Sequence, residues 1–241
     1  MKYPERIVPE EVSPGILALH LKRYEFAQQW TAGADVLDAG CGSGYGTSFL
    51  GRDARRAVGV DRSPEAIEHA RARYAAPKVE FVEADLLRLP LEDASFDVVC
   101  AFETIEHVDD QDAFLAEAAR VLRPDGVLLV STPKSARTTH EPENPFHRVE
   151  LSEEDFERLL WQRFGLVELY GQRRLQTRRH RLAQRLDLLG LRRRLPVLRP
   201  ASRLLGTAPT AEVELDGITI EREGLDRASE LLAVCRRPRP R

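Results

Sequence analysis

Short apolar runs alternate with helical stretches along most of the chain. Ahead of this alternation, apolar residues recur at roughly helical spacing and predict an N-terminal helix over 15–30. Strands are predicted at 35–39, 57–60, 79–83, 96–102, 127–131, 166–170 and 230–235. Helices are predicted between them, beginning near Gly44, Pro64, Asp110 and Ser152. This order predicts an α/β fold with a seven-stranded, mostly parallel sheet that has helices on both faces.

One long segment departs from this pattern. From about 172 to 229, just before the last predicted strand, an arginine-rich stretch with interspersed leucines over 172–205 gives way to an acidic stretch. We interpret it as a basic amphipathic insertion. Three roles are open: a cap over an acceptor pocket, peripheral contact with an anionic membrane surface through 172–205, or a site for a phosphorylated or nucleic-acid substrate.

Composition narrows the class of protein. A length of 241 residues, 42% hydrophobic and 31% charged, suits a single globular domain over 1–241, and a net charge of -3 gives no general affinity for polyanions. No signal peptide and no apolar run of about 18 residues is present. Cys41, Cys100 and Cys235 match no metal or disulfide spacing. We expect reduced thiols in a cytoplasmic protein.

The first candidate site is the glycine-rich turn that follows the first predicted strand. Gly40, Gly42 and Gly44 allow a tight turn and close approach of a ligand to the backbone around Cys41. A dinucleotide site would show G-x-G-x-x-G and hold a pyrophosphate. Here the spacing is G-x-G-x-G, and Asp38 precedes it. A carboxylate there favours a ligand with a positively charged end over one with phosphates.

Acidic residues also end the next two predicted strands. Asp61 stands where a carboxylate can accept hydrogen bonds from both ribose hydroxyls of a nucleoside. Asp85 follows the third strand, where it can reach an adenine amino group, and Leu86 can pack on the ring. Because the carboxyl ends of parallel strands meet at one edge of a sheet, the three acids are expected in one cleft.

Together these motifs resemble the class I S-adenosylmethionine (SAM) dependent methyltransferases, in the branch with ubiquinone-pathway and glycan-modifying enzymes. The resemblance spans roughly 15–170 and rests on six motifs: 38–44, Asp61, 84–86, 96–99, 106–108 and 122–126. It implies a Rossmann-like methyltransferase fold with SAM as cofactor. The residues expected at SAM are Asp38, Gly40, Cys41, Gly42, Gly44, Asp61, Asp85, Leu86 and Glu103.

A metal site is predicted after the fourth strand. Glu103, Glu106 and His107 supply two carboxylates and an imidazole, a suitable ligand set for Mg²⁺ or Mn²⁺. Their spacing resembles that of metal-assisted O-methyltransferases, including ubiquinone-pathway and small-RNA 2′-O-methyltransferases, which implies that the metal lowers the pKa of an acceptor hydroxyl. The alternative is that the Glu106–His107 pair lines the cofactor pocket without a metal.

The polar loop 138–150 is predicted to meet the acceptor, because loops at this edge of an α/β sheet carry specificity. An Asn-Pro-Phe-His element in it resembles methyltransferases of bacterial glycan pathways. His147 is the first candidate for a general base or a fourth metal ligand, with His107 the other predicted catalytic residue and His140 a weaker choice. The alternative is a structural histidine. His20, His69 and His180 are predicted on helix surfaces.

The sequence therefore predicts a SAM-dependent O-methyltransferase. The expected acceptor is a hydroxyl of a sugar, glycan or other polyhydroxylated small molecule, and the basic segment suits an anionic or lipid-linked one. N- or C-methylation of a small metabolite and 2′-O-methylation of RNA are alternatives, although a core without basic patches disfavours nucleic acid. A SAM-binding protein without catalysis is the alternative outside the enzymes.

Overall fold

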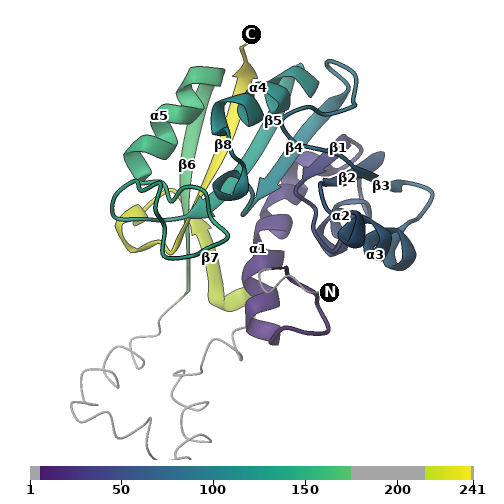
Figure 1. Cartoon of the computed structure of the whole chain (residues 1–241), viewed down its shortest axis with the longest axis horizontal. Coiled ribbons are helices and arrows are strands. Elements are labelled where there is room, and N and C mark those ends of the chain that lie inside the picture. The colour runs from purple at the N-terminus through teal and green to yellow at the C-terminus, as the bar shows by residue number, and fades with distance from the viewer. Residues whose placement is uncertain (1–5, 175–214, 240–241) are drawn as a thin grey trace, which may run out of the picture.

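A computed structural model describes residues 6–174 and 215–239, which form one eight-stranded sheet with helices on both faces (Figure 1). The strand order is β3-β2-β1-β4-β5-β8-β6-β7. The strands are β1 Asp35–Ala39, β2 Arg56–Asp61, β3 Val79–Glu83, β4 Phe96–Phe102, β5 Leu122–Pro133, β6 Phe164–Arg174, β7 Ile218–Glu221 and β8 Glu230–Pro238.

The sheet is mostly parallel, as the sequence predicts. The five strands from β3 to β5 pair in parallel, whereas β8 pairs antiparallel with both β5 and β6. The prediction of seven strands is wrong by one, because β7 pairs antiparallel with the end of β6. This strand and Gln172–Arg174 of β6 lie inside the expected insertion of about 172–229. Much of that insertion, and with it His180, lies outside the described residues.

Five α-helices cover the two faces of the sheet. Figure 1 shows α4 and α5 on one side and α1, α2 and α3 on the other. The helices are α1 Pro14–Thr31, α2 Tyr45–Leu50, α3 Pro64–Tyr74, α4 Gln111–Val121 and α5 Glu153–Arg163. Alternate residues of the strands feed two cores, with Leu37 on the side of α4 and α5 and Val36 on the side of α1 and α2.

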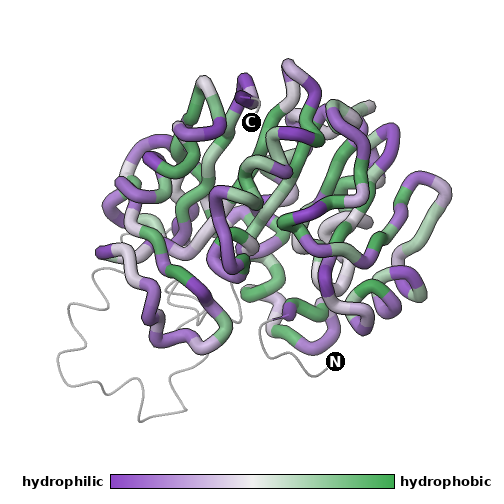
Figure 2. Tube along the Cα trace, turned by 45° about the horizontal axis from the view of Figure 1, so that its top comes forward, coloured by the Kyte–Doolittle hydropathy of each residue, from purple (hydrophilic) through white to green (hydrophobic). Residues whose placement is uncertain are grey.

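Local capping explains where three of these helices begin. The side chains of Ser63, Asp110 and Ser152 accept hydrogen bonds from backbone N–H groups in the first turns of α3, α4 and α5. The helices in turn bury their apolar residues against the strands, and Figure 2 shows the hydrophobic stretches concentrated along the strands. In the described ranges, no helix combines the length and apolar character needed to cross a membrane.

Candidate functional site

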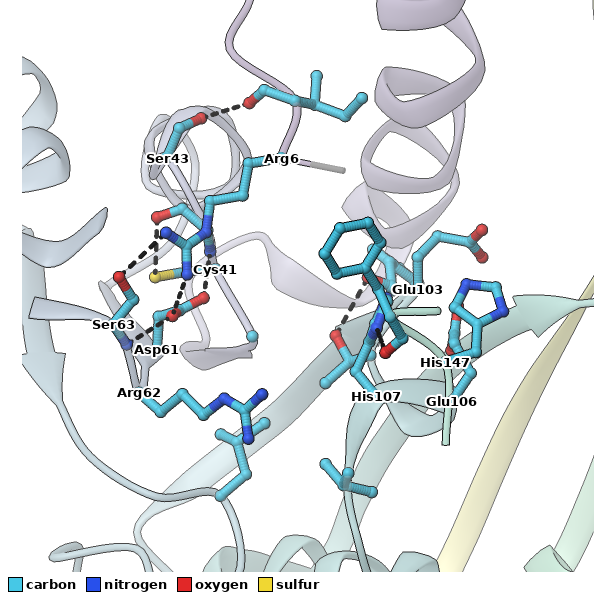
Figure 3. Close-up of a pocket in the computed structure, with 18 of the residues that line it drawn as sticks. Arg6, Cys41, Ser43, Asp61, Arg62, Ser63, Glu103, Glu106, His107 and His147 are labelled. Atoms are coloured by element: carbon cyan, nitrogen blue, oxygen red, sulfur yellow. Dashed lines mark hydrogen bonds and ion pairs between the residues drawn. The ribbon is translucent and has the colours of Figure 1, made fainter. Parts of the chain in front are cut away.

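A pocket of roughly 900 Å³ opens at the carboxyl ends of the parallel strands. Figure 3 shows it from the glycine-rich turn and Asp61 on one side to the histidines on the other. The predicted residues that line it are Gly40, Cys41, Gly42, Asp61, Asp85, Leu86, Glu103, Glu106, His107 and His147. Residues far apart in sequence therefore meet in one cavity, as the sequence predicts.

The turn after β1 depends on glycine at each of its three glycine positions, for different reasons. All three have positive φ, with values of 81° at Gly40, 52° at Gly42 and 89° at Gly44. A Cβ on Gly40 would lie 2.4 Å from Thr104 Oγ1, and one on Gly44 would lie 2.6 Å from Ala70. A Cβ on Gly42 would meet nothing within 4 Å. Gly42 therefore presents bare backbone to the pocket, whereas Gly40 and Gly44 serve packing.

Asp38 does not line the pocket. Its carboxylate is buried under the turn, where it accepts hydrogen bonds from Thr47 Oγ1 at 2.6 Å and from the Tyr24 hydroxyl at 3.4 Å. Burial raises the pKa of Asp38 to about 7, despite these two hydrogen bonds that favour the charged form. In this structure Asp38 supports the turn from beneath, and its predicted contact with a ligand stays a prediction.

Asp61, the predicted ribose acceptor, lines the pocket at the end of β2. Its carboxylate accepts hydrogen bonds from the backbone N–H of Gly42 at 3.0 Å and of Ser63 at 2.9 Å. Arg6 donates to the same carboxylate at 3.2 Å and to the Ser63 hydroxyl at 3.0 Å (Figure 3). The sequence gave no signal for this contact, because Arg6 precedes every predicted element. A ribose at Asp61 would have to share the carboxylate with Arg6 or displace it.

Asp85 and Leu86 lie beyond the end of β3 in the same pocket. The Asp85 side chain accepts a hydrogen bond from the backbone N–H of Leu87 at 2.9 Å, which fixes its carboxylate in a tight turn. Leu86 is mostly buried and presents an apolar surface to the pocket. An acceptor oxygen beside an apolar surface suits the edge and face of an adenine, as predicted.

At the opposite end, Glu106, His107 and His147 form a cluster whose ligand atoms lie within 4.8 Å of one another. Glu106 and His107 belong to the 3-10 helix Ile105–His107, and His147 belongs to the loop after β5. The two imidazole rings meet edge to face with centroids 5.0 Å apart. Glu106 is 1% exposed and neither of its carboxylate oxygens has a hydrogen-bond partner among the described residues.

Burial is the main reason that the pKa of Glu106 lies well above its ordinary value, and the charge of Glu103 adds to it. An orphaned buried carboxylate is costly, so this position demands a proton, a cation or a polar ligand. The cluster fits a divalent cation in donor type, with one carboxylate and two imidazoles. His107 also donates from Nδ1 to the Phe146 carbonyl at 3.0 Å, the orientation typical of a metal-binding imidazole.

His147 is held by its own loop. Its Nδ1 lies 3.2 Å from the Glu150 carboxylate and its Nε2 lies 3.0 Å from the Asn144 side-chain amide. An amide N–H donor makes Nε2 the acceptor and places the ring proton on Nδ1, next to Glu150. A histidine with its proton on Nδ1, held by a carboxylate, has its Nε2 lone pair available for a proton or a metal once Asn144 moves aside.

Glu103 lies outside this three-residue cluster. It adopts a φ of 51°, and its carboxylate accepts a hydrogen bond from the Ser131 hydroxyl at 2.8 Å. A non-glycine residue in the left-handed region at a strand end indicates local strain, of the kind that concentrates in binding sites. Its predicted roles, at the cofactor and at a metal, stay predictions.

His20 corrects the expectation of a helix-surface residue. It lies on α1 and lines the pocket, beside the buried Arg23. The sequence could not show this, because the orientation of α1 depends on contacts with β6, far along the chain. His69 and His140 do not line the pocket.

With this geometry in place, comparisons with known proteins can be weighed. Residues 37–130 match the family described as a methyltransferase domain. In structure, the chain resembles a SAM-dependent methyltransferase of Thermotoga maritima, a possible histamine N-methyltransferase, with a TM-score of 0.62 at 18% identity over 92% of each chain. The chain has the fold of the class I SAM-dependent methyltransferases. That likeness confirms the predicted fold class.

Two curated relatives carry this further in sequence. A protein of Mycolicibacterium smegmatis named as a probable S-adenosylmethionine-dependent methyltransferase is 48% identical over 54% of this chain and 51% of its own length. A fatty-acid O-methyltransferase of the same organism is 41% identical over 43% of this chain and 38% of its own length. Alignments with curated relatives thus span about half of their length or less. They support the methyltransferase class that the sequence predicts and leave its ubiquinone-pathway and glycan branch a prediction.

Proposed function

We propose that this protein is a SAM-dependent methyltransferase that methylates an oxygen atom of a small acceptor. The observation that carries the proposal is the single pocket that joins the glycine-rich turn and Asp61 to the Glu106–His107–His147 cluster. One end of this pocket has the groups that hold a nucleoside with a positively charged side chain. The other end has the groups that accept a proton.

The residues present fit SAM. The open backbone at Gly42 and the turn around it would hold the amino-acid end, Asp61 the ribose, and Asp85 with Leu86 the adenine. SAM supplies a methyl group on a sulfonium, which is already an activated leaving group. The chain therefore needs mainly to position the acceptor in line with that methyl.

Proton removal distinguishes an oxygen acceptor from an amine. A hydroxyl must lose its proton as it is methylated, and His147, with Nδ1 against Glu150, presents Nε2 as the candidate base. His107 and Glu106 beside it can take the proton onward or hold the acceptor. The relative named a fatty-acid O-methyltransferase supports an oxygen acceptor. A sugar, glycan or other polyhydroxylated acceptor remains our expectation from the sequence.

A divalent cation at the same cluster is the second candidate mechanism. It is favoured by the convergence of three ligand atoms within 4.8 Å and by the orphaned Glu106 carboxylate. A cation there would be held by Glu106, His107 and His147 and would lower the pKa of an acceptor hydroxyl. Binding of Mn²⁺ measured by electron paramagnetic resonance, in the wild type and in H147N, tests this site. Loss of binding in H147N is expected if the cation lies there, and no binding by the wild type contradicts it.

The first experiment is isothermal titration of the protein with SAM and with its demethylated product, S-adenosylhomocysteine, each with Mg²⁺ and with chelator. We expect micromolar binding of both nucleosides. Since Asp85 and Leu86 are expected at the adenine, S-inosylhomocysteine, which lacks the adenine amino group, should bind less tightly. Absence of binding by either cofactor form would show that the chain kept the fold and lost the function.

A second experiment separates catalysis from binding. Release of S-adenosylhomocysteine is followed with a panel of sugars, hydroxy acids and fatty acids as acceptors. With any acceptor found, H147N should lower kcat by about 10²-fold or more, the usual contribution of a general base, and leave SAM affinity unchanged. H140N, a histidine of the same loop outside the pocket, is the matched control. Equal kcat in H147N and the wild type would remove His147 from the chemistry.

A further inference from the structure

The pocket has a second polar wall, formed by α1, that the proposed chemistry does not use. His20 lines the pocket on this wall, and Arg23 lies one helical turn behind it. Arg23 is 2% exposed, an uncommon position for a guanidinium. Its environment decides what the wall can bind.

Arg23 is held by neutral groups only. Its Nη1 donates to Gln172 Oε1 at 3.0 Å and its Nη2 to His20 Nδ1 at 3.0 Å, while its Nε has no partner. Gln172, itself fully buried on β6, donates to the Leu19 carbonyl at 2.9 Å and so ties the guanidinium between helix and sheet. Among the described carboxylates, none forms an ion pair with Arg23. A buried cation without a direct counter-charge is costly, often by several kcal/mol.

The nearest acids do little to balance this charge. Glu103 is tied to Ser131 through its carboxylate, and burial raises the pKa of Glu230 even though Arg23 acts to lower it. The raised pKa favours the uncharged form of Glu230. Positive charge behind His20 is therefore left for a ligand in the pocket to balance.

The contact with Arg23 also fixes the chemistry of His20. A guanidinium can only donate hydrogen bonds, so His20 Nδ1 must accept, and the ring proton must lie on Nε2. Arg23 and burial together lower the pKa of His20 to about 3, burial being the larger cause, so the ring stays uncharged at neutral pH. His20 is thus a permanent N–H donor on the pocket wall, with a cation directly behind it.

We propose that His20, backed by Arg23, forms a subsite for a carboxylate on the methyl acceptor. One N–H donor with a single charge behind it suits a monoanion, whereas a phosphate dianion usually meets several direct cationic or backbone donors. The proposal rests on the proposed function, since it places the carboxylate in the same pocket as the methyl donor. It makes His20 a positioning residue, opposite the wall that carries His147.

The test measures binding by the full chain, with and without saturating S-adenosylhomocysteine. Two matched pairs serve as probes: octanoate against octanamide and D-glucuronate against D-glucuronamide. We expect the carboxylate of at least one pair to bind about tenfold more tightly than its amide, because a charge-assisted hydrogen bond is about twice as strong as a neutral one. Equal or undetectable binding of acid and amide in both pairs overturns the proposal.

Variants separate the subsite from general effects. R23M and H20F should each remove most of the preference for the acid, and H20Q, which keeps an N–H donor, should restore part of it. H69F, at a histidine of α3 outside the pocket, is the matched control. Thermal unfolding and S-adenosylhomocysteine affinity show whether each variant folds, and H20F serves if R23M does not. A preference unchanged in H20F overturns the assignment.

Failure of this proposal and failure of the proposed function give different results. A chain that binds S-adenosylhomocysteine and shows no preference for acids contradicts only the carboxylate subsite. A chain that fails to bind S-adenosylhomocysteine contradicts the methyltransferase function, and the titrations without it still measure the preference of the His20 wall.

Discussion

Arg6 and Asp61 make opposite predictions for cofactor binding. Asp61 accepts from Gly42, Ser63 and Arg6 in the pocket. D61A removes the acceptor expected for the ribose hydroxyls and should weaken S-adenosylhomocysteine binding about tenfold or more. R6A frees the carboxylate from a competing donor and should leave affinity equal or higher. Titration of both variants checks this, and weaker binding by R6A would show instead that Arg6 holds the cofactor.

Asp38 predicts a pH dependence of stability. The pKa of Asp38 is about 7 in the folded chain and near 3.8 when unfolded, so folding favours the protonated form. Its contribution is therefore complete below about pH 4 and is lost as pH rises to about 7, by a total of about 4 kcal/mol if the shift is fully expressed. In D38N the free energy of unfolding should change less across this range. Chemical denaturation at several pH values measures it, with D125N as the exposed control.

Single residues were predictable where neighbours in sequence carry the signal. Gly42, Asp61 and Asp85 each follow a predicted strand, and all three line the pocket. Arg6 and His20 were missed because their contacts, with Asp61 and through Arg23 with Gln172, join parts of the chain that no periodicity relates. Asp38 was recognised by its place in the motif, but its burial depends on Tyr24 from another element.

Among elements, the turn between β1 and α2 separates folding from binding. In G40A the new Cβ would overlap Thr104 at a positive φ, so the free energy of unfolding should fall by about 1–3 kcal/mol. In G42A the methyl group would enter open space, so stability should fall by about 1 kcal/mol while S-adenosylhomocysteine binding is largely lost. Thermal unfolding and titration of the pair distinguish them. Greater loss of binding in G40A would contradict this division.

The sequence predicted seven strands and missed β7. Ile218–Glu221 is only 4 residues long and lies at the edge of the sheet in an acidic stretch, so its alternation is too short to separate from a loop. The central strands were predictable because their apolar runs are buried on both faces. Helix starts were predictable because Ser63 and Ser152 act as caps.

For the whole molecule, β8 joins the two halves of the sheet. Residues Leu231 to Cys235 have no exposed surface, and β8 pairs with β5 on one side and β6 on the other. A chain truncated after Gly224 should therefore fail to fold, although it keeps all of the matched family region 37–130. A chain truncated after Pro238 should fold. Far-UV circular dichroism and thermal unfolding decide, and a cooperative transition in the shorter chain would contradict the role given to β8.

The three cysteines give this molecule a built-in chemical clock. All are free and buried, and burial raises the pKa of each thiol, so none reacts readily with a thiol reagent in the closed fold. Cys100 and Cys235 lie within the sheet, and only Cys41 borders the pocket. Labelling of Cys41 thus reports how often the turn opens, and labelling of the other two reports how often the whole sheet comes apart.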